Sequence, residues 1–153
     1  MNSNEINIFA KHLKIHPFLG VYAADQLCNI KPDEIGVLVC NTEPSNESGQ
    51  HWIGISLNKK KIIYFDSLNG EFHKSQYLRN FQKQIGKDFL RNDIQIQPHD
   101  SDKCGVHALV FCYVLAKQKD EAVYVRFLSS FASHKLKVRE ELSLHYFFLT
   151  LQL

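Results

Sequence analysis

The 153-residue sequence contains no stretch that approaches the roughly 18 consecutive apolar residues of a membrane-spanning helix. Its opening segment, MNSNEINIFAKHLKIHPF, also lacks the apolar centre of a secretory signal peptide. Internal repeats and low-complexity tracts are missing as well. We therefore expect a single domain spanning residues 1–153, with no membrane contact, in a reducing intracellular setting that keeps its thiols free.

The four cysteines include no Cys-x-x-Cys pair, which argues against a zinc ribbon. One weaker zinc interpretation remains open. Cys104 and His107 have helical i, i+3 spacing, with His99 and Cys112 nearby, but no second well-spaced pair accompanies them. We expect neither a metal nor a cofactor.

A strong charge of one sign is also absent, because 18 basic and 16 acidic residues leave a net charge of only +2. Bulk charge therefore does not indicate a nucleic-acid-binding protein, and any association with DNA is expected to be weak. The basic run at residues 59–61 is interpreted as a solvated hairpin tip.

Hydrophobic periodicity places the expected strands in the middle of the chain, with helices before and after them. This order predicts an α+β fold with one central mixed sheet packed against helices. Proline at position 17 ends the first helix. The expected helices are residues 4–14, 23–30, 72–90, 104–117, 121–131 and 136–149, and the expected strands are residues 36–41, 51–57, 61–66 and 93–97.

Cys104 lies where a polar segment turns into an apolar helix. Unpaired backbone N–H groups and the helix dipole favour a negative charge at this point, so a thiolate there is stabilised. Gly105 follows directly and leaves room beside the sulfur. A buried structural cysteine is the competing interpretation of this position, and it is the preferred one for Cys112, inside the same apolar helix.

A cysteine nucleophile needs a base, and His51 is the candidate that opens a strand. If the hairpin turns at residues 58–59, His51 faces Asp66 directly across the strand pair, on the same face of the sheet. The carboxylate can then accept the Nδ1–H of the ring and favour the imidazolium. A cross-strand surface pair is the alternative interpretation.

Gln97 is the candidate for a fourth role, because its side-chain amide carries two N–H donors. Near the backbone N–H of Cys104 it would form an oxyanion hole. Taken alone, a glutamine at a strand end is usually only solvated, so its role depends on the other three residues.

Four stretches, taken in order, read FLGVYAADQL, VLVCNTEPSNESGQHWIGIS, IYFDSLNG and QPHDSDKCGVHALVFC. Together they resemble the adenovirus-type cysteine proteases, called adenain, in the clan that also holds the SUMO-specific and ubiquitin-like-protein proteases. The most specific pieces are His-Trp after a Gly-containing loop, Phe-Asp-Ser with Gly soon after, and Gln-x6-Cys-Gly. The resemblance runs from Phe18 to Cys112 and implies the cysteine-protease fold of this family.

This resemblance implies a Cys-His-Asp triad of Cys104, His51 and Asp66, with Gln97 in the oxyanion hole. It also implies an endopeptidase that cleaves after a small residue, with Gly expected, and that matures capsid or precursor proteins of a virus or virus-like element. Such an enzyme works in the cytoplasm or nucleus of the host, or is packaged in the virion.

Two features depart from the family pattern. No cysteine lies between Gly70 and Gln97 to hold an activating peptide through a disulfide, so that mode of activation is not indicated. The sequence leaves open whether DNA or a peptide held in another way is an activator. The chain is also short, which favours extended peptides over folded ubiquitin-like proteins as substrates. The alternatives are a deconjugating isopeptidase, a non-enzymatic peptide-binding module with this fold, and a DNA-binding accessory protein, which the charge disfavours.

Overall fold

The computed structural model describes residues 1–117 and 121–152. A five-stranded mixed sheet forms its centre, with the strands in the order β1-β2-β3-β4-β5. The strands are β1 (Phe18–Tyr22), β2 (Gly36–Asn41), β3 (Trp52–Leu57), β4 (Lys61–Phe65) and β5 (Asp88–Arg91). The helices are α1 (Ser3–His12), η1 (Ala24–Asn29), η2 (Phe72–Lys74), α2 (Gln76–Ile85), α3 (Cys104–Lys117), α4 (Glu121–Ala132) and α5 (Leu136–Leu151).

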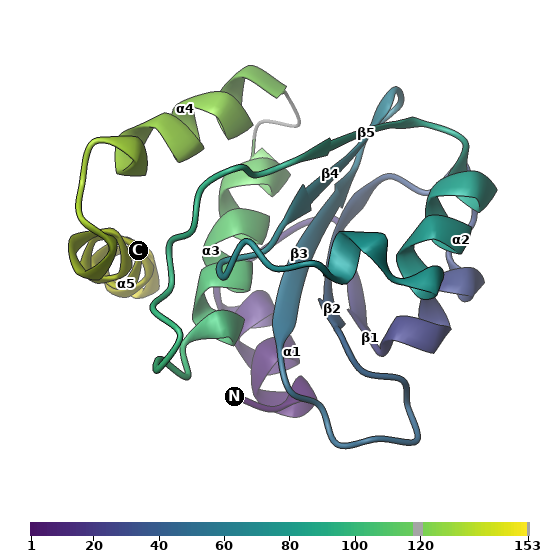
Figure 1. Cartoon of the computed structure of the whole chain (residues 1–153), viewed down its shortest axis with the longest axis horizontal. Helices are drawn as coiled ribbons and strands as arrows, with labels where there is room; N and C mark the ends of the chain where they lie inside the picture. The colour runs from purple at the N-terminus through teal and green to yellow at the C-terminus, as the bar shows by residue number, and fades with distance from the viewer. Residues whose placement is uncertain (118–120, 153) are drawn as a thin grey trace.

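Strands β2, β3 and β4 form an antiparallel centre, and each outer strand adds in parallel: β1 beside β2, and β5 beside β4. Helices cover both faces of this sheet, with α1 and α3 on one side and α2 on the other (Figure 1). Helix α5 lies on the far side of α3 from the sheet (Figure 1). Helix α4 packs beside α3 and also contacts β4, where the Tyr124 hydroxyl donates to the carbonyl oxygen of Tyr64 at 2.7 Å. The predicted α+β class, with a mixed sheet packed against helices, is confirmed.

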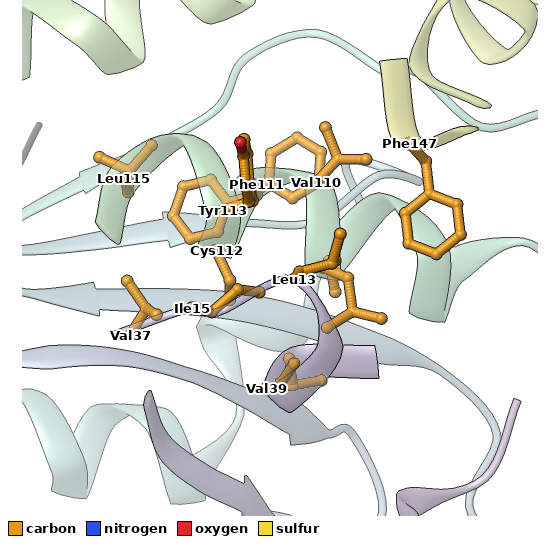
Figure 2. Packing of buried hydrophobic residues seen from close by; sticks show 14 of the residues in the cluster. Leu13, Ile15, Val37, Val39, Val110, Phe111, Cys112, Tyr113, Leu115 and Phe147 are labelled. Atoms are coloured by element: carbon orange, nitrogen blue, oxygen red, sulfur yellow. The ribbon is translucent and has the colours of Figure 1, made fainter. Parts of the chain in front are cut away.

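The alternation of side chains along each strand divides the core into two layers. In β2, Val37 and Val39 join the cluster around α3, whereas Leu38 and Cys40 join the cluster formed with η1 and α2. Figure 2 shows Val37 and Val39 in the first cluster, together with α3 residues and Phe147 of α5. Because both faces are covered, the central strands are buried along almost their whole length, and their sequences are apolar runs rather than alternating ones.

Helix α3 is buried on nearly all sides between the sheet and α5. It packs closely over β3 because position 54 has no side chain: a Cβ on Gly54 would lie 2.3 Å from Cδ1 of Phe111. Phe111 in turn stacks on Phe65 of β4, with ring centroids 5.2 Å apart. This packing fixes the height of α3, and therefore of its first residue, relative to the ends of β3 and β4. In the described part of the chain, no helix combines the length and apolar character needed to cross a membrane.

The region after β4 differs from the prediction. The single helix expected over residues 72–90 is instead the short η2 followed by α2, which ends at Gly86 in the left-handed conformation, and β5 follows it. The strand expected over residues 93–97 is wrong, because these residues are irregular. Strand β1, which was not predicted, has an irregular register beside Gly20, and a glycine inside a short strand weakens its sequence signal.

The predicted hairpin between β3 and β4 exists with a different turn. Gly54 pairs with Phe65 and Leu57 with Ile62, so the turn is centred on residues 59–60 rather than 58–59. The register is therefore shifted by two residues from the prediction. A shift of two keeps every side chain on its predicted face, whereas a shift of one would reverse the faces.

Candidate active site

Cys104 is the first residue of α3 and is 8% exposed. It therefore lies at the helix terminus where backbone N–H groups have no intrahelical partner. The neighbouring Gly105 allows a close approach, since a Cβ there would lie 3.1 Å from the Met1 side chain and 3.3 Å from Cδ1 of Trp52. The residue next to the sulfur-bearing Cys104 thus packs closely against the indole ring of Trp52.

His51 immediately precedes β3, and Asp66 immediately follows β4. Their side chains meet although the register differs from the prediction: His51 Nε2 lies 2.7 Å from Asp66 Oδ1. Asp66 is therefore not directly opposite His51, but the two keep a common face of the sheet. The prediction that Nδ1 contacts the carboxylate is also wrong, because Nε2 does so and Nδ1 remains for the cysteine.

The Asp66 carboxylate is buried and well satisfied. Oδ1 accepts the backbone N–H of Leu68 and Oδ2 accepts that of Gly70, both at 2.9 Å. The first bond is an Asx turn, in which an aspartate binds the backbone two residues ahead. These donors fix the carboxylate with one oxygen directed at His51, so Asp66 orients the imidazole.

The site favours a charged pair of cysteine and histidine. Burial alone would lower the pKa of His51, but hydrogen bonds to Asp66 and Cys104 raise it to about 9. Burial raises the pKa of Cys104, yet its hydrogen bonds with His51 and with the backbone of Trp52 and Gly105 lower that pKa overall. Burial likewise raises the pKa of Asp66, and the hydrogen bond and charge of His51 lower it overall. Both shifts favour a thiolate beside an imidazolium over a neutral thiol and imidazole.

Gln97 is 2% exposed and lies in the irregular segment that leads into α3. Its Oε1 accepts the hydroxyl of Ser67 at 2.7 Å, and its Nε2 donates to the carbonyl oxygen of Ser101 at 2.7 Å. Both bonds fix which end of the amide is the donor. Because the amide has two N–H groups, one remains after the bond to Ser101.

Asn92 is a buried residue that the sequence interpretation missed. Its side chain accepts the N–H of Asp66 at 2.9 Å and donates to the carbonyl oxygens of Asp66 and Ile94. Beyond the end of β5, the Asn92 side chain therefore makes the hydrogen bonds that a paired strand would make to the backbone of Asp66. These bonds fix the position of the Asp66 backbone. The Asx-turn pattern after Asp66 was readable from the sequence, but nothing local marked Asn92, which lies 26 residues away.

A second missed feature connects α5 to the segment before Cys104. The Ser101 hydroxyl donates to Glu140 of α5. The guanidinium of Arg139 donates to the carbonyl oxygen of Gln95 at 2.8 Å. Helix α5 thus holds the segment that carries Gln97, and no sequence signal links partners this far apart.

The residues of the zinc interpretation do not form a metal site. Within residues 1–117 and 121–152, no three His, Cys, Asp or Glu side chains gather in a way that could hold a metal ion. His107 is instead buried, with Nδ1 2.8 Å from the hydroxyl of Ser143. Cys112 is fully buried in the core and lies 3.4 Å from the carbonyl oxygen of Leu38.

No family model and no curated protein sequence matches the chain. Solved structures do match. The ASFV pS273R protease aligns with a TM-score of 0.61 at 13% identity, over 97% of this chain and 65% of that one. ChlaDub1 from Chlamydia trachomatis aligns with a TM-score of 0.48 at 15% identity, over 76% of this chain and 61% of that one.

At 13% identity, the likeness to the ASFV protease shows a shared fold, and it confirms the fold that the sequence resemblance implied. This chain spans less than two thirds of the length of that protease.

Proposed function

We propose that this chain is a cysteine protease in which Cys104, His51 and Asp66 form the catalytic triad and Gln97 contributes to the oxyanion hole. The observation that supports this proposal most strongly is geometric: three side chains distant in the sequence meet in one buried cluster, with His51 Nε2 2.7 Å from Asp66 Oδ1 and a hydrogen bond between His51 and Cys104. The raised pKa of His51, about 9, and the lowered pKa of Cys104 agree with this arrangement. Both shifts favour the thiolate, which is the nucleophilic form of cysteine.

In the first step, the Cys104 thiolate attacks the carbonyl carbon of the scissile bond and forms a carbon–sulfur bond. The carbonyl electron pair moves to oxygen, where the backbone N–H of Cys104 and the remaining N–H of Gln97 stabilise the negative charge. The intermediate collapses as the carbon–nitrogen bond breaks, and His51 gives its proton to the leaving amine.

The second step reverses these roles. His51, now neutral, takes a proton from water, whose oxygen attacks the thioester carbon. The carbon–sulfur bond breaks, which releases the acid and restores the thiolate beside the imidazolium. Asp66 stays ionised throughout and holds the ring through Nε2, so Nδ1 carries the transferred proton.

We propose substrates with a small residue, Gly above others, on the acyl side of the cleaved bond. The close approach of Trp52 to Gly105, directly beside the nucleophile, supports this specificity because it leaves little width there. The resemblance to adenain supports capsid or precursor proteins as natural substrates. We place the activity inside an infected cell, in the cytoplasm or nucleus, or within the virion.

Internally quenched peptides that differ only in the residue before the cleaved bond test this proposal. We expect cleavage in the order Gly, then Ala, with Leu and Phe resistant. Cys104→Ala should abolish turnover, Cys28→Ala should retain it because Cys28 is exposed and distant in the sequence from the triad, and a chelator should have no effect. Unchanged cleavage by Cys104→Ala would refute the proposed nucleophile.

An isopeptidase would use the same sulfur on a lysine-linked bond, and the fold is compatible with both reactions. Ubiquitin and SUMO carrying C-terminal electrophiles separate the two activities. We expect the quenched peptides to be cleaved and both probes to label Cys104 slowly. Fast labelling by either probe, without peptide cleavage, would favour deconjugation.

A further inference from the structure

A second feature of the molecule's surface lies between helices α3, α4 and α5. It contains a cavity of about 660 Å³, a size typical of ligand sites. None of the proposed catalytic residues lines it. The cavity therefore needs an explanation of its own, one that does not depend on the proposed protease activity.

The apolar wall on α5 is a stripe at helical spacing that stays largely exposed, although Tyr146 meets the ring of Tyr113 of α3 with centroids 6.3 Å apart. Val138, Leu142, Tyr146 and Leu149 follow one another at intervals of four, four and three residues, and they are 38–49% exposed. The last three of these residues line the cavity. Exposed large apolar side chains at this spacing form one face of a helix, and a contiguous exposed patch of this kind marks an interaction surface.

Helix α4 supplies a matching wall. Val123, Phe127 and Phe131 are spaced four residues apart, and all three line the cavity. Eight residues of helix extend about 12 Å, which is about two turns. We call the space between these two apolar stripes the α4–α5 groove. Its length suits about two turns of an amphipathic helix laid between two others.

The charged side chains around the α4–α5 groove have one sign. Lys117 and Arg126 line it, and among the described lining residues none is acidic. Lys117 lies over the ring of Tyr113, with Nζ 4.3 Å from the centroid, so its charge is held at the groove. A ligand with acidic side chains beside its apolar face is therefore complementary.

We propose that the α4–α5 groove is a docking site for an amphipathic helix of a protein partner, with acidic residues flanking its apolar face. A second copy of this chain is a poorer occupant. A symmetric dimer through this face would set the basic residues of one copy against those of the other.

The test uses a fluorescein-labelled peptide of sixteen or so residues, with Leu and Phe at positions i, i+3, i+4 and i+7 and Glu on both flanks. Fluorescence anisotropy against the full chain should show saturable binding that weakens as salt is raised. A peptide with the same apolar pattern but Lys in place of Glu should bind at least about tenfold more weakly.

Two variants and two matched controls locate the site. Arg126→Glu and Leu142→Asp should each weaken binding of the Glu peptide about tenfold or more. Lys137→Glu and Val125→Asp change an exposed basic and an exposed apolar residue outside the cavity, and should stay within about twofold of the parent. Arg126→Glu should also gain affinity for the Lys peptide.

Several results would overturn the proposal. These are no saturable binding of the Glu peptide, equal binding of both peptides, or equal loss in the control variants. Binding of laurate without binding of the Glu peptide would assign the groove to a small amphiphile instead. Self-association in sedimentation equilibrium that Leu142→Asp abolishes would assign it to a second copy. Cleavage of the quenched peptides is measured separately, so failure here leaves the protease proposal standing.

Discussion

Replacing Asp66 by asparagine tests the charge state of the site, because it keeps the shape of the side chain and removes its charge. The Asp66 and His51 side chains are 3% and 14% exposed, so solvent screens their interaction little. A hydrogen bond to a charged group contributes about 1.5–3 kcal/mol, and a neutral one about 0.5–1.5 kcal/mol. The imidazolium therefore loses about 1–1.5 kcal/mol, which lowers the pKa of His51 by about 1 and the population of the thiolate–imidazolium pair about tenfold.

The assay is alkylation of Cys104 by iodoacetamide across pH, followed by mass spectrometry of the labelled peptides. Because the thiolate is the reacting form, we expect the half-maximal rate to occur at higher pH in Asp66→Asn than in the parent. The exposed Cys28 serves as an internal reference in the same sample, and Asp33→Asn, an exposed aspartate, is the matched control.

The same substitution has a second, separable effect on stability. The asparagine amide has one oxygen where the carboxylate has two, so either the Leu68 or the Gly70 N–H loses its acceptor. A buried unsatisfied donor costs about 1–3 kcal/mol, which urea unfolding measures. If folded Asp66→Asn and the parent gave superimposable alkylation profiles, the reasoning about the charged pair would be wrong.

Three further predictions concern acidity, positioning and packing. Peptide cleavage should rise with pH as the nucleophile ionises and fall above about pH 9, where His51 loses the proton it gives to the leaving amine; a plateau through pH 10 would contradict this. Glu140→Ala should lower kcat about ten- to a hundredfold with little change in KM, because Glu140 holds Ser101, which in turn holds Gln97. Glu140→Gln keeps an acceptor for Ser101 and should recover most of the activity. Glu141→Ala is the control and should resemble the parent. Gly54→Ala should cost about 1–3 kcal/mol in urea unfolding, because its Cβ would meet Phe111 at 2.3 Å.

Much of the fold was predictable because the hydrophobic pattern of each segment agrees with the way that segment packs in the folded chain. The apolar run of β2 and the period of α3 each indicated the element that formed. The errors lie where short-range signals compete. The expected helix over residues 72–90 took in most of β5, because Gly86, whose left-handed cap ends α2, was not recognised as a stop signal.

The candidate site was predictable to the extent that residue type and face determine it. His51 and Asp66 were expected to share a face of the sheet, and they do, since the register error was two residues and not one. The hydrogen bonds of Asn92 and Glu140 were not predictable, because they join segments 26 and 39 residues apart that only the packed core brings together. No periodicity encodes such contacts.

The chain has a single tryptophan, Trp52, and it stands beside the nucleophile with its indole N–H donating to the carbonyl oxygen of Met1 at 2.8 Å. Its fluorescence emission therefore reports on the surroundings of the nucleophile alone. When a peptide binds next to residue 104, its backbone replaces the solvent and polar groups around the indole, so the emission should change. In the inactive Cys104→Ala protein, association could be followed in this way in real time, without a dye and without turnover.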